Sequence, residues 1–94
     1  MPQLSTPWTW QFPPIAEPLG LRHQIISIAG EVKEALDAYD DGESNERIAE
    51  ELIDVLHRAE TAIRELPFNE LELDRIKRGV IEKNDRRGYY GGES

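Results

Sequence analysis

Two pairs of acidic residues with the same spacing stand close together in the sequence. Glu31 and Glu34 are three residues apart, and Glu51 and Asp54 repeat that spacing. Like charges one helical turn apart repel each other when both lie on a helix. A hard cation such as Mg²⁺, which prefers oxygen ligands, would offset that repulsion. The four carboxylates are therefore candidates for a metal site, and the alternative is that they form an ordinary solvated face.

Two helices are expected to carry these pairs. Apolar residues recur at helical spacing from 21 to 39, and the turn-forming stretch "DDGES" then breaks the pattern. A second helix is predicted over 45–66, where Ser44 or Asn45 would be the N-cap and Pro67 the stop. If the two helices form an antiparallel hairpin, the four carboxylates can converge.

A third helix is predicted near the C-terminus. Asn69 and Glu72 have the spacing of a capping box, in which each residue satisfies a backbone donor near the other. The apolar pattern continues to Arg87, and Gly88 is placed as a C-terminal cap. The chain should therefore be all-α, with about three helices.

The N-terminal residues have a different composition from the rest. Residues 1–20 contain five of the six prolines and both tryptophans, so they are expected to form an extended arm. Residues 21–90 would then be a single helical domain, and 91–94 a short flexible tail. Three helices bury little area alone, which favours a helical bundle completed by oligomerisation, as a homodimer or homotetramer.

The helical phase of the second helix separates its charged residues. Rotation of about 100° per residue places Glu51 and Asp54 at the flank of the apolar stripe, whereas Glu50 points to the solvated side. Two further pairs, Glu43–Arg47 and Glu60–Arg64, look like plain surface ion pairs.

The first helix has small residues beside its acidic pair. Ala35 and Ala38 share a face with Glu31 and Glu34, and small side chains let another backbone approach closely. The pair Asp54–Arg58 has ordinary i,i+4 spacing, but no basic residue follows Glu31 or Glu34 at that distance.

Polar residues continue the apolar line of the third helix at its C-terminal end. Lys83, Asn84 and Arg87 fall on nearly the same face, with Arg86 further round. Lysine and arginine donate hydrogen bonds to phosphate oxygens. The alternative is that cations near a helix C-terminus only complement the helix dipole.

The overall composition excludes several classes of function. The net charge of −8 argues against binding to a nucleic-acid polymer. The absence of cysteine excludes disulfides and thiolate metal sites. The N-terminal sequence lacks the features of a signal peptide, and no stretch is apolar enough to span a membrane. A cytoplasmic protein without a membrane partner is expected.

The ordered set of motifs resembles the all-α nucleoside triphosphate pyrophosphohydrolases, the MazG-like superfamily. The resemblance rests on "EVKE" (Glu31, Glu34), on "ELID" (Glu51, Asp54) and on "KNDRRGYY", which begins at Lys83. It implies a helical bundle in which the four carboxylates hold Mg²⁺, with Mn²⁺ as a substitute. It also implies hydrolysis of a nucleoside triphosphate to the monophosphate and pyrophosphate.

The same resemblance assigns the substrate contacts. Phosphates or sugar would be bound by Lys83, Asn84, Arg86 and Arg87. Base stacking would fall to aromatic residues of the N-terminal segment and first helix, with Trp8, Trp10 and Tyr39 as candidates. The alternative for the tryptophans is that they pack the arm onto a neighbouring subunit.

Three other functions are alternatives to this one. The first is a pyrophosphatase of the same fold with a narrow substrate, such as phosphoribosyl-ATP or a pyrimidine deoxynucleotide. The second, a ferritin-like di-metal oxidase, is rejected because only His57 follows an acid at the right spacing and His23 does not supply the second motif. The third is a non-catalytic helical oligomerisation or binding module with solvated acids.

Overall fold

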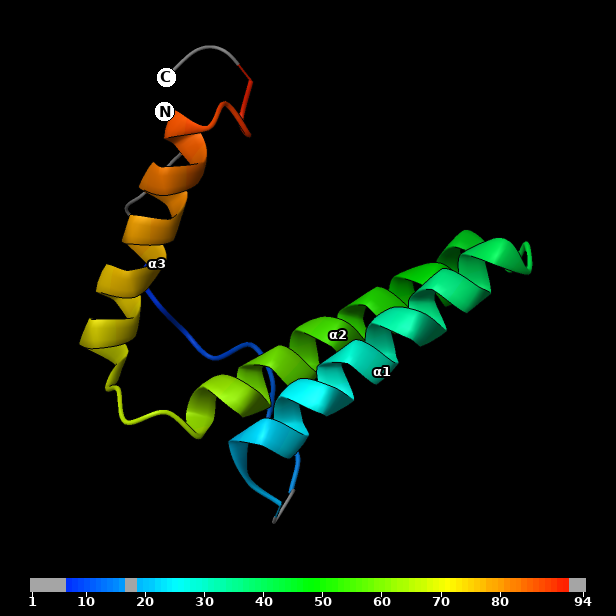
Figure 1. Cartoon of the computed structure of the whole chain (residues 1–94), viewed down its shortest axis with the longest axis horizontal. Coiled ribbons are helices and arrows are strands. Elements are labelled where there is room, and N and C mark those ends of the chain that lie inside the picture. The colour runs from blue at the N-terminus through cyan, green and yellow to red at the C-terminus, as the bar shows by residue number, and fades with distance from the viewer. Residues whose placement is uncertain (1–6, 17–18, 92–94) are drawn as a thin grey trace. The chain divides into compact units, whose positions relative to one another are not determined.

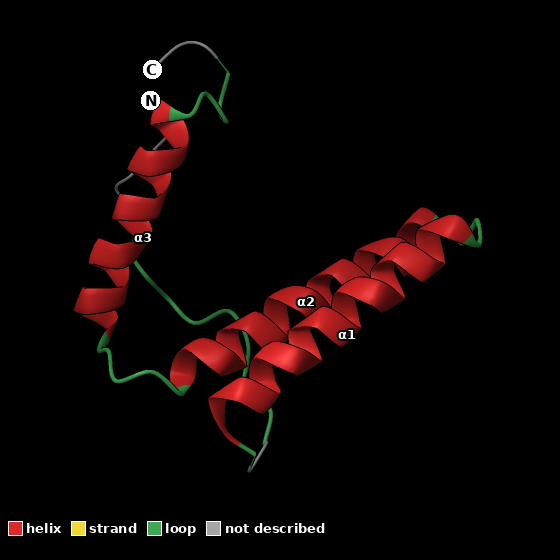
Figure 2. Ribbon diagram, in the orientation of Figure 1, coloured by secondary structure: helices red, strands yellow, loops and turns green. Residues whose placement is uncertain are grey.

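The computed structural model describes residues 7–16 and 19–91, and over these it contains three helices and no strand (Figures 1 and 2). The helices are α1 (Gly20–Asp40), α2 (Asn45–Arg64) and α3 (Glu70–Arg86). The predicted all-α fold class is confirmed.

The helix boundaries follow from local capping chemistry. Ser44 caps α2, because its hydroxyl oxygen accepts a hydrogen bond of 3.1 Å from the Arg47 backbone N–H. The capping box of Asn69 and Glu72 is present at the start of α3. α2 ends at Arg64, two residues earlier than predicted, because Pro67 disfavours helical geometry in the residue before it.

The described residues divide into two compact units. One is Trp10–Pro67, and the other joins residues 7–9 with 68–91. In the first unit, α1 and α2 lie side by side as an antiparallel hairpin (Figure 1). Their turn contains Gly42 at φ +71°, a left-handed conformation that glycine adopts without steric cost.

Small residues fill the seam between α1 and α2. Ala35, Ala38 and Ala62 are buried there, as expected for two backbones in close approach. The most deeply buried side chain of the described chain is polar: Gln24 has 0% exposure, and neither atom of its amide group has a hydrogen-bond partner. A buried amide without partners costs about 1–3 kcal/mol.

Much of the apolar stripe of the hairpin remains exposed. On α1, Val32 and Leu36 are about half exposed and Tyr39 is 69% exposed. On α2, Leu52 and Leu56 are likewise about half exposed. The hairpin alone thus leaves uncovered an apolar face that a stable protein would usually bury.

Side chains of α2 hold the N-terminal arm through hydrogen bonds with the arm's backbone. The Glu60 carboxylate accepts from the backbone N–H groups of Gln11 (2.7 Å) and Phe12 (2.9 Å). Thr61 accepts from Ile15 N–H at 3.1 Å, and His57 Nε2 lies 2.8 Å from the carbonyl oxygen of Pro13.

These contacts correct the prediction that Glu60 and Arg64 form a plain surface pair. Glu60 is only 9% exposed, because the arm covers it. The Arg64 guanidinium lies 4.1 Å above the ring of Trp10 and donates to the carbonyl oxygen of Phe12. Both side chains are used to dock a segment distant in sequence, which helical spacing does not reveal.

The second unit is built around α3. Leu73 is buried there, and the backbone N–H of Trp8 donates to Asp74 Oδ1 at 3.0 Å. Asp74 also pairs with Arg78 at 2.9 Å. The helix ends before Gly88, whose φ of +78° agrees with its predicted role as a C-terminal cap.

Over the described residues, none of the helices combines the length and hydropathy needed to cross a lipid bilayer.

Candidate metal centre

Three of the predicted acidic residues come together on one side of the hairpin. Glu31 extends from α1, and Glu51 and Asp54 extend from adjacent turns of α2. One carboxylate oxygen from each residue lies within 4.8 Å of the others. The close approach is possible because Ala35 and Ala38 occupy the seam beside them. We refer to Glu31, Glu51 and Asp54 as the acidic triad.

Glu34, the fourth predicted acid, interacts with two members of the triad. Its proximity is one cause of the raised pKa values of Glu31 and Glu51. A cation bound by these carboxylates would favour their ionised forms.

Burial and mutual repulsion favour the protonated forms of these acids. Burial raises the pKa of Glu31, the charge and hydrogen bond of Glu34 and the charge of Asp54 raise it further, and Arg58 opposes them. Burial also raises the pKa of Glu51; Arg47 lowers it, and Glu34 and Asp54 raise it. For both residues the rise outweighs the effect of the arginine.

Two arginines of α2 flank the triad. Arg47 NH1 lies 2.7 Å from Glu51 Oε1, a close ion pair. Arg58 Nε lies 3.9 Å from Glu31 Oε1, across the seam between the helices. The predicted surface pair of Arg47 with Glu43 is present at 3.5 Å, but the spacing of Asp54 and Arg58 did not indicate the contact of Arg58 with Glu31. The missed signal is that both arginines fall within about 40° of Glu51 on the helix surface.

One oxygen of the triad is buried without a partner. Glu51 is 4% exposed, and its Oε2 atom accepts no hydrogen bond, whereas Oε1 forms the ion pair with Arg47. An orphaned buried oxygen of a carboxylate carries a large desolvation cost. A cation at this position would remove that cost.

The donor set fits a hard divalent cation. All the available ligand atoms are carboxylate oxygens, which suit Mg²⁺, Mn²⁺ or Ca²⁺ rather than softer metals. If all four acids are ionised, their four negative charges and the two flanking guanidinium charges leave a net charge of −2. One divalent cation would balance that charge.

Glu50 lies outside the triad, in agreement with its predicted orientation. Its side chain is exposed and pairs with Arg47 at 3.3 Å. Glu50 is therefore an internal reference for an α2 carboxylate that does not reach the site.

The predicted substrate contacts are not members of the acidic triad. Lys83, Asn84, Arg86 and Arg87 lie at the C-terminal end of α3, in the other compact unit. Trp10 has one ring face covered by Arg64. Tyr39 lines an apolar groove instead. Phosphate and base binding by these residues stay predictions.

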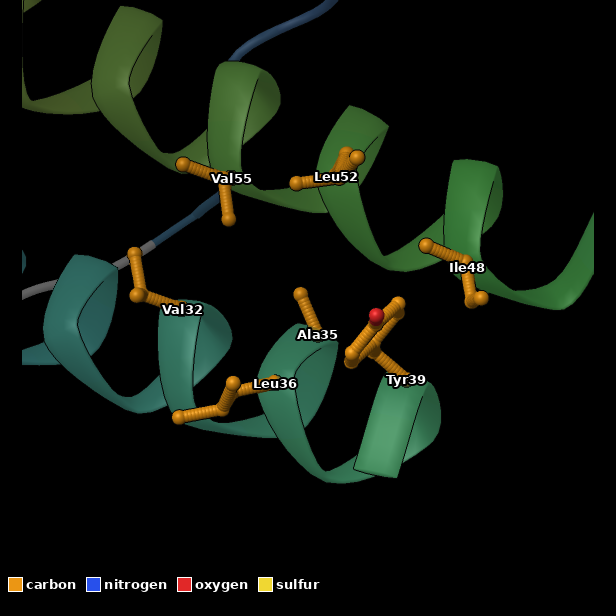
Figure 3. A pocket seen from close by; sticks show the side chains of 7 residues that line it. All are labelled: Val32, Ala35, Leu36, Tyr39, Ile48, Leu52 and Val55. Atoms are coloured by element: carbon orange, nitrogen blue, oxygen red, sulfur yellow. The ribbon is translucent and has the colours of Figure 1, made fainter. Parts of the chain in front are cut away.

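The apolar groove occupies the other side of the hairpin. It has a volume of about 340 Å³, and Figure 3 shows the side chains that line it. At 100° per residue, the midpoint of the groove residues lies about 120° from the midpoint of the acidic pair on α1, and about 100° from it on α2. The lining residues are Val32, Ala35, Leu36, Tyr39, Ile48, Leu52 and Val55.

Comparisons with protein-family models, with curated proteins and with solved structures found no match.

Proposed function

We propose that this chain is a Mg²⁺-dependent nucleoside triphosphate pyrophosphohydrolase of the MazG-like type. The observation that carries the proposal is the buried Glu51, whose partnerless Oε2 belongs to a triad of converging carboxylates. The ordered E-x-x-E and E-x-x-D pairs on consecutive helices give the chemical class by resemblance. Mn²⁺ would substitute for Mg²⁺, since the ligands are the same hard oxygens.

The acidic residues would bind the cation and assist the attack of water. Glu31, Glu51 and Asp54 would hold the cation, which would neutralise phosphate charge and activate a water molecule. Glu34, the acid outside the triad, would complete the set of metal ligands, and one of the four carboxylates would accept a proton from the attacking water. Attack at the α-phosphorus would break its bond to the bridging oxygen and release pyrophosphate.

The remaining substrate contacts follow from the resemblance. Lys83, Asn84, Arg86 and Arg87 would bind phosphates or sugar, and Trp10 or Tyr39 would stack on the base. The exposed apolar face would be covered by a second copy of the chain, giving a homodimer or a homotetramer. A cytoplasmic nucleotide pool would supply the substrate.

A hydrolysis panel tests this proposal. Wild-type protein is incubated with Mg²⁺ and each ribo- and deoxynucleoside triphosphate, and pyrophosphate and orthophosphate are measured separately. We expect pyrophosphate from the wild type, and a loss of at least about 100-fold in Glu34→Gln with unchanged helical content. Including phosphoribosyl-ATP separates the narrow-substrate alternative.

Glu50→Gln is the matched control, because it removes one exposed carboxylate from α2 without touching the triad. It should retain nearly full activity. Equal activity in wild type and Glu34→Gln would contradict the proposal.

A binding module is the second candidate, and the exposed apolar groove favours it. It predicts no hydrolysis of any triphosphate and no change in melting temperature with Mg²⁺.

A further inference from the structure

The two arginines beside the acidic triad have different surroundings. Arg47 is held by carboxylates of its own helix: Glu43 at 3.5 Å, Glu50 at 3.3 Å and Glu51 at 2.7 Å. Its side chain is 49% exposed. Its short bond fixes the Oε1 atom of Glu51 and leaves Oε2 directed elsewhere. Arg47 is therefore suited to position a metal ligand.

Arg58 meets the triad from the opposite end. Its Nε atom is 3.9 Å from Glu31 Oε1 on the other helix, longer than the 2.7–2.9 Å of a charge-assisted hydrogen bond. The contact is thus mainly a charge–charge attraction. The side chain is 25% exposed, so the guanidinium is partly desolvated but still reaches the surface. Partial desolvation strengthens its attraction for anions.

A bound cation would weaken the attraction between Arg58 and Glu31. Without it, the guanidinium is drawn to the negative charge of Glu31. A divalent cation on Glu31, Glu51 and Asp54 would compensate most of the negative charge of the triad. A triphosphate bound to that cation would then bring new negative charge beside the guanidinium. A phosphate group fits because the planar guanidinium can donate two parallel hydrogen bonds to its oxygens.

We propose that Arg58 is a phosphate-binding residue of this site, and that its guanidinium moves from Glu31 to the phosphate oxygens of a cation-bound triphosphate. The inference rests on the proposed function and adds to it a substrate contact from α2 itself. Arg47 is the contrasting case, a positioning residue that holds Glu51.

Calorimetry on the full chain tests this assignment without relying on hydrolysis. Mg²⁺ is first titrated into wild type, Arg58→Gln and Arg47→Gln without nucleotide. A non-hydrolysable triphosphate with an imido group between the α and β phosphorus atoms is then titrated at saturating Mg²⁺. Circular dichroism verifies the helical content of each variant, and Arg58→Lys retains the charge without the planar fork.

The two titrations should respond in opposite directions for Arg58→Gln. Mg²⁺ affinity should be unchanged or higher, because a positive charge beside the site is removed. Affinity for the triphosphate analogue should fall about 10- to 100-fold, as expected for lost hydrogen bonds to a charged group. Arg58→Lys should lie between wild type and Arg58→Gln. Arg47→Gln should instead weaken Mg²⁺ binding, and should affect the analogue only through the bound cation, because Arg47 acts on the metal ligand Glu51 and not on the substrate.

The alternative outcomes are separable. If wild type binds Mg²⁺ and the analogue, but Arg58→Gln binds the analogue equally well, the assignment of Arg58 is overturned and the proposed function stands. A loss of Mg²⁺ affinity in Arg58→Gln would make Arg58 a structural residue of the triad and would also overturn it. Wild-type protein that binds neither Mg²⁺ nor the analogue would overturn both proposals.

Discussion

The two faces of the α1–α2 hairpin are built from the same helices but have opposite chemistry. On one face, carboxylates from both helices approach within 4.8 Å of one another. On the other, Val32, Leu36 and Leu52 border an apolar groove. Acids in close approach need positive charge, whereas exposed apolar side chains need removal from water. The acidic face thus requires positive charge and the apolar face requires an apolar cover, so different partners must meet the two requirements.

The seam between the faces makes this arrangement possible. Ala35 and Ala38 are small enough to let the helices approach closely, so Glu31 reaches Glu51 and Asp54. The same alanines contribute little buried area to the hairpin itself. The two helices therefore approach closely on the acidic face but bury only a small core between them. As a result, the stability of the fold depends more on the apolar face.

The largest expected effect comes from making the apolar face polar. Leu36→Gln combined with Leu52→Gln changes no charge and replaces two side chains that are already about half exposed. If a second copy covers this face, each leucine is lost twice in a symmetric dimer. We expect the dissociation constant to rise by about 100-fold or more in analytical ultracentrifugation.

The acidic face serves as the control for that experiment. Because the two leucines lie away from the triad, Mg²⁺ affinity measured on the same sample should stay close to wild type. An unchanged sedimentation profile would mean that the apolar face is not the interface.

A smaller effect is expected from pH, and it concerns only the acidic face. The raised pKa of Glu31 means that the folded state binds its proton more tightly than the unfolded state, whose ordinary value is 4.5. The resulting stabilisation is complete below that value and is lost as pH rises through the raised pKa. Metal-free wild type should therefore lose stability relative to Glu31→Gln as pH rises above about 4.5 and through the raised pKa.

Urea unfolding of both proteins across that range measures the difference directly. Saturating Mg²⁺ should remove the disadvantage of the wild type at neutral pH, because the cation binds the ionised carboxylate. Parallel pH profiles for the two metal-free proteins would show that Glu31 does not hold its proton in the folded state.

Local features of the sequence were enough to predict the helices and much of the acidic cluster. The cap at Ser44 and the box at Asn69 and Glu72 are short-range patterns with a backbone mechanism. Convergence of the acids followed from their repeated spacing on two helices joined by a short turn. Neither argument needs contacts between residues far apart in sequence.

Long-range contacts account for what was missed. Glu60 is buried only because Gln11 and Phe12 donate their backbone N–H groups to it, and no periodicity links those positions. Gln24 has the spacing of a seam residue, seven positions before Glu31, but its polar side chain concealed this. Arg58 contacts Glu31 across the seam, so its partner is visible only once the two helices are paired.

The most direct test of the acidic face is a Mg²⁺ titration of wild type and Asp54→Asn at neutral pH, followed by calorimetry and by thermal unfolding. Asp54 is an exposed member of the triad, so its replacement should not disturb the fold. We predict that Mg²⁺ at about 100 times its dissociation constant stabilises wild type by about 2.7 kcal/mol. That corresponds to a rise of at least about 10 °C in Tm, and Asp54→Asn should bind at least about 100-fold more weakly. A wild-type Tm that does not respond to Mg²⁺, or equal affinity in the two proteins, would contradict a metal centre at this site.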